Sequence, residues 1–175
     1  MSAIFVLGVS HRTAALALRE QLALTEGRAA GVLNALTSEE TVSEAAALST
    51  CNRTELYLVV GDPVDAEAAA LGVLAREAGI RPTELLGPLY SLRSSEAAAH
   101  LYRVTAGLDS MILGEAEIQG QVKRAYQLAL VLSAVAAARA LGLQPAGLTA
   151  LLAFFPAVRV LDVSSDAGDT ARRRA

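Results

Sequence analysis

The sequence is poor in the residue types that build several common kinds of functional site. Among its 175 residues there are one cysteine, two histidines and no tryptophan, and aromatic residues make up 4%. The single cysteine excludes a disulfide framework, and together with so few histidines it excludes the usual Cys/His zinc sites. The few aromatic side chains argue against a base-stacking platform of several rings. No G-x-G-x-x-G motif or Walker loop is present, and no cluster of acidic residues indicates a metal site.

What the chain does contain is enough apolar sequence for a folded core. Hydrophobic residues make up 53%, which excludes a disordered chain, and the length suits one domain, or one domain with an unfinished second. The net charge of −3 and the isoelectric point near 5.4 argue against a general nucleic-acid-binding surface. The apolar run Ile4–Val9 is too short for a secretory signal, and no basic region precedes it. Together with the lone thiol, this predicts a reducing, cytoplasmic location.

The composition of the chain changes near residue 127. Residues 1–127 hold nine arginines and one lysine against twelve glutamates and three aspartates, which gives a net charge of −5. Residues 128–175 hold no glutamate and no lysine but thirteen alanines, five arginines and three aspartates, which gives a net charge of +2. We therefore predict a folded domain over 1–127 and a divergent, alanine-rich tail over 128–175.

The tail allows two interpretations. Ala140–Val158 is a run of nineteen uncharged residues, which is the length of a membrane span. Glutamine, glycine and two prolines interrupt this run, and the rest is mostly alanine and leucine, which favours a buried helix pair broken at Pro145. Residues 164–175 are small, polar and finally arginine-rich, so we expect them to be frayed.

Hydrophobic periodicity predicts an α+β fold for residues 1–127. The expected order is strand, helix, strand, strand, helix, strand, which matches a ferredoxin-like split βαβ sheet with its helices on one face. Thr25 is expected to cap the first helix, while Asp62 with Pro63 opens the second and Gly79 ends it. The expected strands are 4–9, 45–48, 56–60 and a weaker one over 86–92. Two further helices, from about 95 to 108 and from 115 to beyond 126, precede the helical or irregular tail.

Cys51 is the residue on which any catalytic chemistry would depend. It lies in the polar stretch 49–53 between two predicted strands, where scaffolds often present reactive groups. Arg53 follows two residues later, and a nearby cation favours the thiolate that attacks a carbonyl carbon. An inert, partly buried thiol is the other interpretation, although structural cysteines are more often embedded in apolar runs.

The two histidines are expected to differ in role. His100 falls outside the apolar stripe predicted for its helix, which runs through Ala98, Leu101, Tyr102, Thr105 and Leu108. It is therefore either a solvated surface residue or a proton donor and acceptor to a neighbouring thiol or ester. His11 follows the first strand, and we expect it to organise that loop by hydrogen bonds without a catalytic role.

The last predicted helix has a polar face as well as an apolar one. Glu117, Gln121 and Arg124 line up on the polar face. Such a face is usually only solvated, but glutamate and glutamine side chains also orient the amines and hydroxyls of a ligand. Ser110 lies in the connection that precedes this helix.

Three motifs resemble, in order and spacing, those of glutamyl-tRNA reductases. They are Gly8–Ala14 (GVSHRTA), Ser49–Tyr57 (STCNRTELY) and Gly107–Glu115 (GLDSMILGE), and the similarity continues through Gln119–Lys123. The resemblance covers residues 1 to about 127, and three motifs together are far more specific than one. It implies the catalytic N-terminal domain of an enzyme that opens tetrapyrrole biosynthesis by reducing glutamyl-tRNA to glutamate-1-semialdehyde with NADPH.

The resemblance implies roles for individual residues. The Cys51 thiolate attacks the ester carbonyl, releases the tRNA and leaves a glutamyl thioester, which hydride then reduces. Arg53 is the expected partner of the glutamate carboxylate, and His100 matches a family histidine important for activity. The other positions that match substrate contacts are Thr50, Asn52, Ser110, Glu115, Ala116, Glu117 and Gln121. The family commonly has Pro and Gln where this chain has Ala116 and Glu117, so a carboxylate replaces an amide at position 117.

Residues 128–175 depart from the family pattern. The family continues into a Rossmann NADPH domain and a helical dimerisation domain, and this tail resembles neither. The loss of glutamate and lysine is typical of a shifted reading frame in a GC-rich gene, and a divergent natural terminus is the other interpretation. We therefore expect a monomer, with no membrane span and no metal, that acylates Cys51 and hydrolyses the thioester without completing the reduction. Its expected partners are glutamyl-tRNA and the aminomutase that takes the aldehyde.

Two other functions stay open on the sequence. One is a non-catalytic module that binds tRNA or a protein partner through the same surface, which slow alkylation of Cys51 would favour. The other is a thiol hydrolase of a different small ester, which transfer of acyl groups unrelated to glutamate would favour. The net negative charge leaves local arginines to contact an RNA, so we expect weak, salt-sensitive binding through Arg12, Arg53, Arg103 and Arg124.

Overall fold

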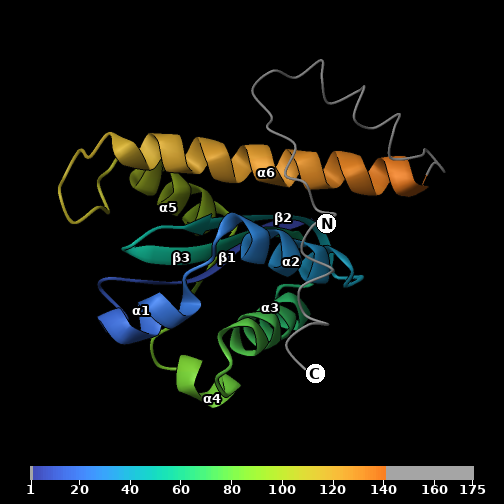
Figure 1. Ribbon diagram of the computed structural model, residues 1–175, viewed down its shortest axis with the longest axis horizontal. Helices are drawn as coiled ribbons and strands as arrows, with labels where there is room; N and C mark the ends of the chain where they lie inside the picture. The colour runs from blue at the N-terminus through green and yellow to red at the C-terminus, as the bar shows by residue number, and fades with distance from the viewer. Residues whose placement is uncertain (1, 141–175) are drawn as a thin grey trace, which may run out of the picture. The chain divides into compact units, whose positions relative to one another are not determined.

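A four-stranded antiparallel sheet forms the centre of the fold. The computed structural model describes residues 2–140, and the sheet lies in a compact unit that residues 1–132 form. The strand order is β2–β3–β1–β4, formed by β1 (Ala3–Ser10), β2 (Val42–Ser49), β3 (Arg53–Val60) and β4 (Tyr90–Arg93). This is the order of a split βαβ sheet, so the predicted ferredoxin-like α+β fold is confirmed (Figure 1).

The two faces of the sheet have different chemistry. Alternate residues of a strand point to opposite faces, so Phe5, Leu7 and Val9 of β1 share one face. With apolar residues of β3 they form the main core against α2 (Glu26–Thr37) and α3 (Pro63–Ala78). The other face carries polar residues at the centre of the sheet, because Ser10 pairs with Arg53 and Gly8 pairs with Glu55.

The helices of the split βαβ unit lie on the core face, as predicted. Two short helices, α1 (Leu16–Leu22) and α4 (Pro82–Leu85), also contribute to this core through Leu22 and Leu85. The later helices α5 (Ser95–Thr105) and α6 (Glu117–Ala140) begin over the other face, where Leu48, Val104 and Ile118 form a second, smaller apolar cluster (Figure 1). The polar side of the sheet is thus partly covered, which leaves room there for a pocket.

The sequence missed or misplaced several elements. It missed α1, which has a single buried residue and therefore no apolar stripe. The strand expected over 86–92 was wrong at its start, because α4 ends at Leu85 and pairing with β1 begins at Tyr90. The caps of α2 and α3 are confirmed: Thr25 accepts a hydrogen bond from the Arg28 N–H, and Asp62 from the Val64 N–H.

The predicted tail lies mostly beyond the described residues. α6 starts at Glu117 rather than at 115 and continues to Ala140, across the composition change at 127. No helix in residues 2–140 combines the length and the apolar character that a membrane span needs. The helix pair around Pro145, most of the run Ala140–Val158 and the frayed end fall outside the part of the chain that the structure describes.

Candidate functional site

The β2–β3 hairpin presents the single cysteine of the chain at its tip. Thr50, Cys51 and Asn52 connect the two strands, and the Cys51 thiol is free and exposed. The Thr50 N–H donates to the Arg53 carbonyl at 2.8 Å, and the Asn52 N–H donates to Thr50 Oγ1 at 3.1 Å. The interpretation of Cys51 as a partly buried thiol was therefore wrong.

Two neighbouring segments hold this turn from outside the hairpin. The His11 backbone N–H donates to the Asn52 carbonyl at 2.8 Å. The Arg19 guanidinium, from α1, donates through Nη1 to the Cys51 carbonyl at 2.9 Å and to Asn52 Oδ1 at 3.3 Å. Burial lowers the pKa of His11, and the charge of Arg12 lowers it further, so its ring is neutral at pH 7. The turn that carries the thiol is thus fixed by hydrogen bonds to its main chain.

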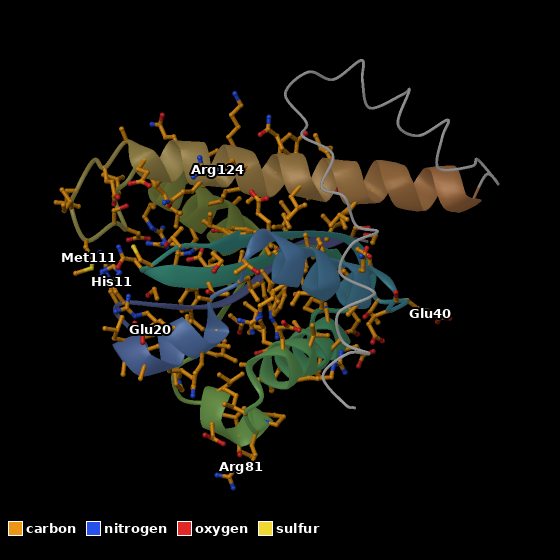
Figure 2. The ribbon with its side chains drawn as sticks, viewed as in Figure 1. His11, Glu20, Glu40, Arg81, Met111 and Arg124 are labelled. Atoms are coloured by element: carbon orange, nitrogen blue, oxygen red, sulfur yellow. The ribbon has the colours of Figure 1, made fainter. Side chains whose placement is uncertain are left out.

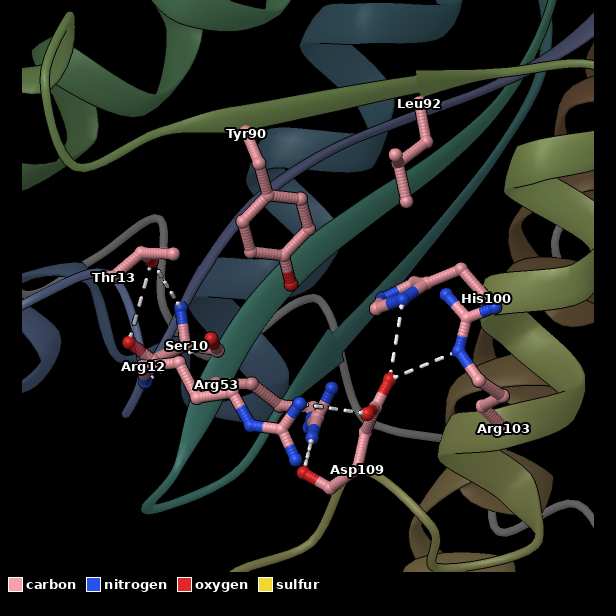
Figure 3. A pocket seen from close by; sticks show the side chains of 9 residues that line it. All are labelled: Ser10, Arg12, Thr13, Arg53, Tyr90, Leu92, His100, Arg103 and Asp109. Carbon is pink, nitrogen blue, oxygen red and sulfur yellow. Dashed lines mark hydrogen bonds and ion pairs between the residues drawn. The ribbon is translucent and has the colours of Figure 1, made fainter.

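A pocket of about 280 Å³ lies over the polar face of the sheet (Figure 3). We call it the first pocket, and its lining residues are Ser10, Arg12, Thr13, Arg53, Tyr90, Leu92, His100, Arg103 and Asp109. They come from β1 and the turn after it, from β3 and β4, from α5 and from the loop that precedes α6. The first pocket adjoins the thiol-bearing turn, because Arg53 follows Asn52 directly and Arg12 follows His11.

A buried glutamate lies behind the wall of the first pocket. Glu55 is 0% exposed, and its carboxylate accepts four hydrogen bonds from side chains. The donors are Arg53 Nη1 at 2.7 Å, His100 Nε2 at 2.9 Å, Tyr57 Oη at 2.6 Å and the Tyr90 hydroxyl. We call these five residues the Glu55 cluster. Three of its members line the first pocket, so the cluster fixes the positions of functional groups in the pocket wall.

The charges in the Glu55 cluster follow from its contacts. Burial alone would raise the pKa of Glu55, but the hydrogen bond from His100, the charge of Arg53 and the two tyrosine hydroxyls lower it to about 2. Burial raises the pKa of Tyr57 and of Tyr90, and the Glu55 charge raises both further. At neutral pH the glutamate is therefore ionised, and both tyrosines stay protonated as donors.

Acid is expected to remove the stabilisation that the Glu55 charge provides. The pKa of Glu55 is lower in the folded than in the unfolded chain, so its contribution is complete above about pH 4.5 and is lost as pH falls towards 2. We predict that the difference in unfolding free energy between the parent and Glu55→Gln shrinks by about 3 kcal/mol from pH 6 to pH 2. Urea unfolding followed by circular dichroism at several pH values measures this difference. A difference that does not change with pH would contradict the assignment of a charged Glu55.

Asp109 attaches the loop before α6 to the first pocket. Its Oδ1 lies 3.2 Å from Arg12 Nη1, and its Oδ2 lies 3.5 Å from Arg103 Nε. Its backbone carbonyl accepts a hydrogen bond from Arg53 Nη2 at 2.6 Å. Figure 3 shows these side chains converging on Asp109 from different sides. One short acidic residue therefore connects the loop to the turn after β1, to β3 and to α5.

His100 lies between two carboxylates. Its Nε2 faces Glu55, and its Nδ1 lies 3.5 Å from Asp109 Oδ2. The interpretation as a solvated histidine was wrong, because the buried face of α5 consists of Ala97, His100 and Val104. Tyr102, which was expected in the apolar stripe, is 75% exposed. Because the Glu55 carboxylate can only accept, His100 Nε2 donates to it, and Nδ1 is the ring nitrogen that faces Asp109.

The structure brings some of the predicted site residues together and separates others. Thr50, Cys51 and Asn52 form the hairpin tip, and Arg53 and His100 line the first pocket. The Arg53 guanidinium, expected to meet a ligand carboxylate, is instead 3% exposed and bound to Glu55 and to the Asp109 carbonyl.

The remaining predicted residues lie on the loop and on α6. Ser110 is buried beside Asp109, Glu115 is half-buried, and Ala116 and Glu117 are exposed at the start of α6. Gln121 donates to Glu117 and, with Arg124, lines a second pocket of about 170 Å³ next to β2 and α2. None of Glu117, Gln121 and Arg124 lines the first pocket.

The residues that sequence reasoning missed are Glu55, Tyr90 and Asp109. For Glu55 a signal was present, because Arg53, Glu55 and Tyr57 alternate with apolar residues along β3 and so share one face. No local pattern pointed to Tyr90 or Asp109, whose contacts join segments far apart in the chain. Within residues 2–140, no group of three or more His, Cys, Asp or Glu side chains is arranged to hold a metal ion.

Comparison with known proteins agrees with the three sequence motifs Gly8–Ala14, Ser49–Tyr57 and Gly107–Glu115. A family model described as the N-terminal domain of glutamyl-tRNA(Glu) reductase matches residues 7–141. The chain is 49% identical to glutamyl-tRNA reductase from Chromohalobacter salexigens and 48% identical to that from Rubrobacter xylanophilus, in each case over 126 residues. These matches cover 72% of this chain but 29% of each relative. The solved structure of glutamyl-tRNA reductase from Methanopyrus kandleri matches with a TM-score of 0.57 and 29% identity, over 74% of this chain and 29% of that one.

Proposed function

Because the chain belongs to the glutamyl-tRNA reductase family and corresponds to its N-terminal domain, we propose that it accepts the glutamyl group of glutamyl-tRNA on Cys51. The observation that supports this proposal is the exposed thiol at a hairpin tip whose main chain is held by Arg19 and His11. A nucleophile needs both access to the substrate and a fixed position, and this turn combines them.

In the proposed reaction the Cys51 sulfur, as thiolate, attacks the ester carbonyl carbon. A C–S bond forms and the ester C–O bond breaks, so the terminal ribose oxygen leaves with the electron pair and takes up a proton. His100 is the proposed proton donor, because it lines the first pocket and its Nδ1, 3.5 Å from Asp109, makes the looser of its two contacts. Water then hydrolyses the thioester, which gives free glutamate and restores the thiol.

Thr50 and Asn52 are the proposed contacts of the glutamyl group near the thiol. Arg53 is proposed with them on the grounds of the family resemblance, and it would meet the substrate carboxylate by exchanging its contact with the Asp109 carbonyl. Ser110, Glu115, Ala116, Glu117 and Gln121 remain proposed substrate contacts on the grounds of the family resemblance. Because Glu117 and Gln121 do not line the first pocket, they would contact a part of the substrate outside it. We propose that residues 1–127 form the catalytic domain and that residues 128–175 are divergent.

In the full-length family NADPH would supply the hydride that converts the thioester into the aldehyde. The described residues do not fit this cofactor, since each neighbouring pair of strands is antiparallel and no glycine-rich loop joins a strand to a helix start. We therefore assign no reduction step to residues 2–140.

The experiment that tests the proposal is intact-mass spectrometry after a short incubation with glutamyl-tRNA. We expect the parent chain to gain the mass of one glutamyl group and Cys51→Ser to gain none, because a serine hydroxyl at this position lacks the nucleophilicity of a thiolate. Free glutamate is measured in parallel, since rapid hydrolysis would keep the adduct from accumulating.

The control is the stability of the variant. Cys51 is exposed, so we expect Cys51→Ser to unfold at the same urea concentration as the parent. Equal adduct formation by Cys51→Ser would show that Cys51 is not the nucleophile. If the folded parent gave neither the adduct nor free glutamate, the proposed chemistry would be rejected and a non-catalytic binding module would be favoured.

A further inference from the structure

Positive charge is concentrated at the first pocket, although residues 1–127 carry a net charge of −5. Arg12 follows β1, Arg53 lies on β3 and Arg103 lies on α5, and all three line this pocket. Three other exposed or half-buried arginines are each paired with a glutamate: Arg28 with Glu77, Arg81 with Glu84 and Arg93 with Glu67. At the first pocket three arginines face two carboxylates, those of Glu55 and Asp109, which leaves an excess of one positive charge.

Two of these arginines are available to a ligand. The side chains of Arg12 and Arg103 are 59% and 49% exposed, whereas Arg53 is enclosed by its contacts with Glu55 and Asp109. Arg12 is held by one contact through Nη1, and Arg103 by one contact of 3.5 Å through Nε. Their other N–H groups have no partner among the described residues. One carboxylate, that of Asp109, thus faces two exposed guanidinium groups.

We propose that Arg12 and Arg103 form a phosphodiester-binding site at the mouth of the first pocket. This site receives the last phosphate of the RNA, the one that joins the terminal nucleotide to its neighbour. The inference rests on the proposed function, because an ester on the terminal ribose brings that phosphate towards the thiol-bearing turn. Arginine presents parallel N–H groups that match phosphate oxygens, and an exposed position suits a phosphate that stays partly hydrated.

Asp109 takes a defined part in this site. Its carboxylate contacts both arginines and lies at the position that an incoming anion would approach. It neutralises one of the two charges and leaves an excess of one, so it lowers the affinity of the pair for phosphate without abolishing it.

The test uses the full chain with Cys51→Ser, which prevents acylation, and a fluorescein-labelled single-stranded RNA ending in CCA. Binding is followed by fluorescence anisotropy at several NaCl concentrations. Arg12→Gln and Arg103→Gln are compared with Arg81→Gln. Arg81 is an exposed arginine at the start of α4 that does not line the first pocket and lies away from His11 in Figure 2. All three substitutions remove one positive charge, so a general effect of net charge would appear in each.

We expect Arg12→Gln and Arg103→Gln each to weaken RNA binding several-fold and to reduce the slope of log K against log salt by about 0.7. Arg81→Gln should leave both quantities unchanged. Asp109→Asn should change binding in the opposite direction, strengthening it several-fold, because it removes the competing carboxylate.

Several outcomes would overturn the inference. They are absence of RNA binding, equal effects of all three arginine substitutions, and loss of the arginine-dependent binding when free glutamate is added, which would show that the pair binds a carboxylate. Acylation of Cys51 by a small glutamyl thioester tests the proposed function separately, because that substrate has no phosphate. Acylation without arginine-dependent RNA binding rejects the phosphate site alone. Arginine-dependent RNA binding without acylation rejects the proposed chemistry alone.

Discussion

Glu55→Gln is expected to destabilise the protein by about 3–5 kcal/mol. The substitution keeps the shape of the side chain but leaves the buried Arg53 guanidinium, which is 3% exposed, opposite a neutral amide. The new amide also carries an NH₂ group, which faces hydroxyl and ring N–H donors where the carboxylate accepted four hydrogen bonds. At least one buried donor therefore loses its acceptor. Urea unfolding at pH 7, followed by circular dichroism, measures the change.

The matched control is Glu67→Gln. Glu67 also pairs with an arginine, Arg93, at 2.9 Å, but both side chains are substantially exposed, and such pairs contribute at most about 1 kcal/mol. The same chemical change should therefore have a small effect on the surface and a large one in the Glu55 cluster. Equal effects of the two substitutions would show that the Glu55 cluster does not stabilise the fold.

Gly8→Ala is expected to destabilise the protein by about 3 kcal/mol, through crowding rather than through loss of charge. Gly8 lies in the centre of β1, opposite Glu55 on β3 and Tyr90 on β4. A methyl group at this position would lie 2.8 Å from Cγ of Glu55, 2.8 Å from the Thr54 carbonyl oxygen and 3.0 Å from Cα of Glu55. Two of these atoms are backbone, so β1 and β3 would have to separate or Glu55 would have to leave its partners.

Gly72→Ala gives a control of opposite sign. Gly72 lies inside α3, and apart from its chain neighbours and the nearby backbone of its own helix, no atom lies within 4 Å of the place where its methyl group would be. Alanine favours the helix over glycine by about 0.5–1 kcal/mol, so this variant should be more stable than the parent. If Gly8→Ala proved as stable as the parent, the close approach of β1 to Glu55 would not be what requires glycine at this position.

These two predictions concern the same requirement. The first pocket has polar walls, and three of the side chains in them, those of Arg53, Tyr90 and His100, are held by a carboxylate that does not line the pocket. Glycine at position 8 allows that carboxylate to lie against the sheet. Stability and the arrangement of the first pocket therefore depend on the same few atoms.

Much of the fold could be predicted from the sequence, because local patterns determine it. Thr25 and Asp62 cap their helices in the structure, and short apolar runs identified the strands. α1 could not be predicted in this way, since only Leu22 of its seven residues is buried. The contact of Arg19 with the Cys51 carbonyl was not foreseen either, because Arg19 lies on α1 and the contact spans 32 positions of the chain.

The sequence by itself determined the order of the four strands and of the helices α2, α3, α5 and α6, the ferredoxin-like arrangement and the family, because caps, periodicity and motifs are properties of neighbouring residues. Only the tertiary structure decided which of the candidate residues meet. Periodicity shows that residues share a face of a helix or strand, but it does not show what packs against that face. His100 illustrates the difference: the face of α5 that looked polar is buried, because Glu55 of β3 and Asp109 of the following loop supply partners for both ring nitrogens.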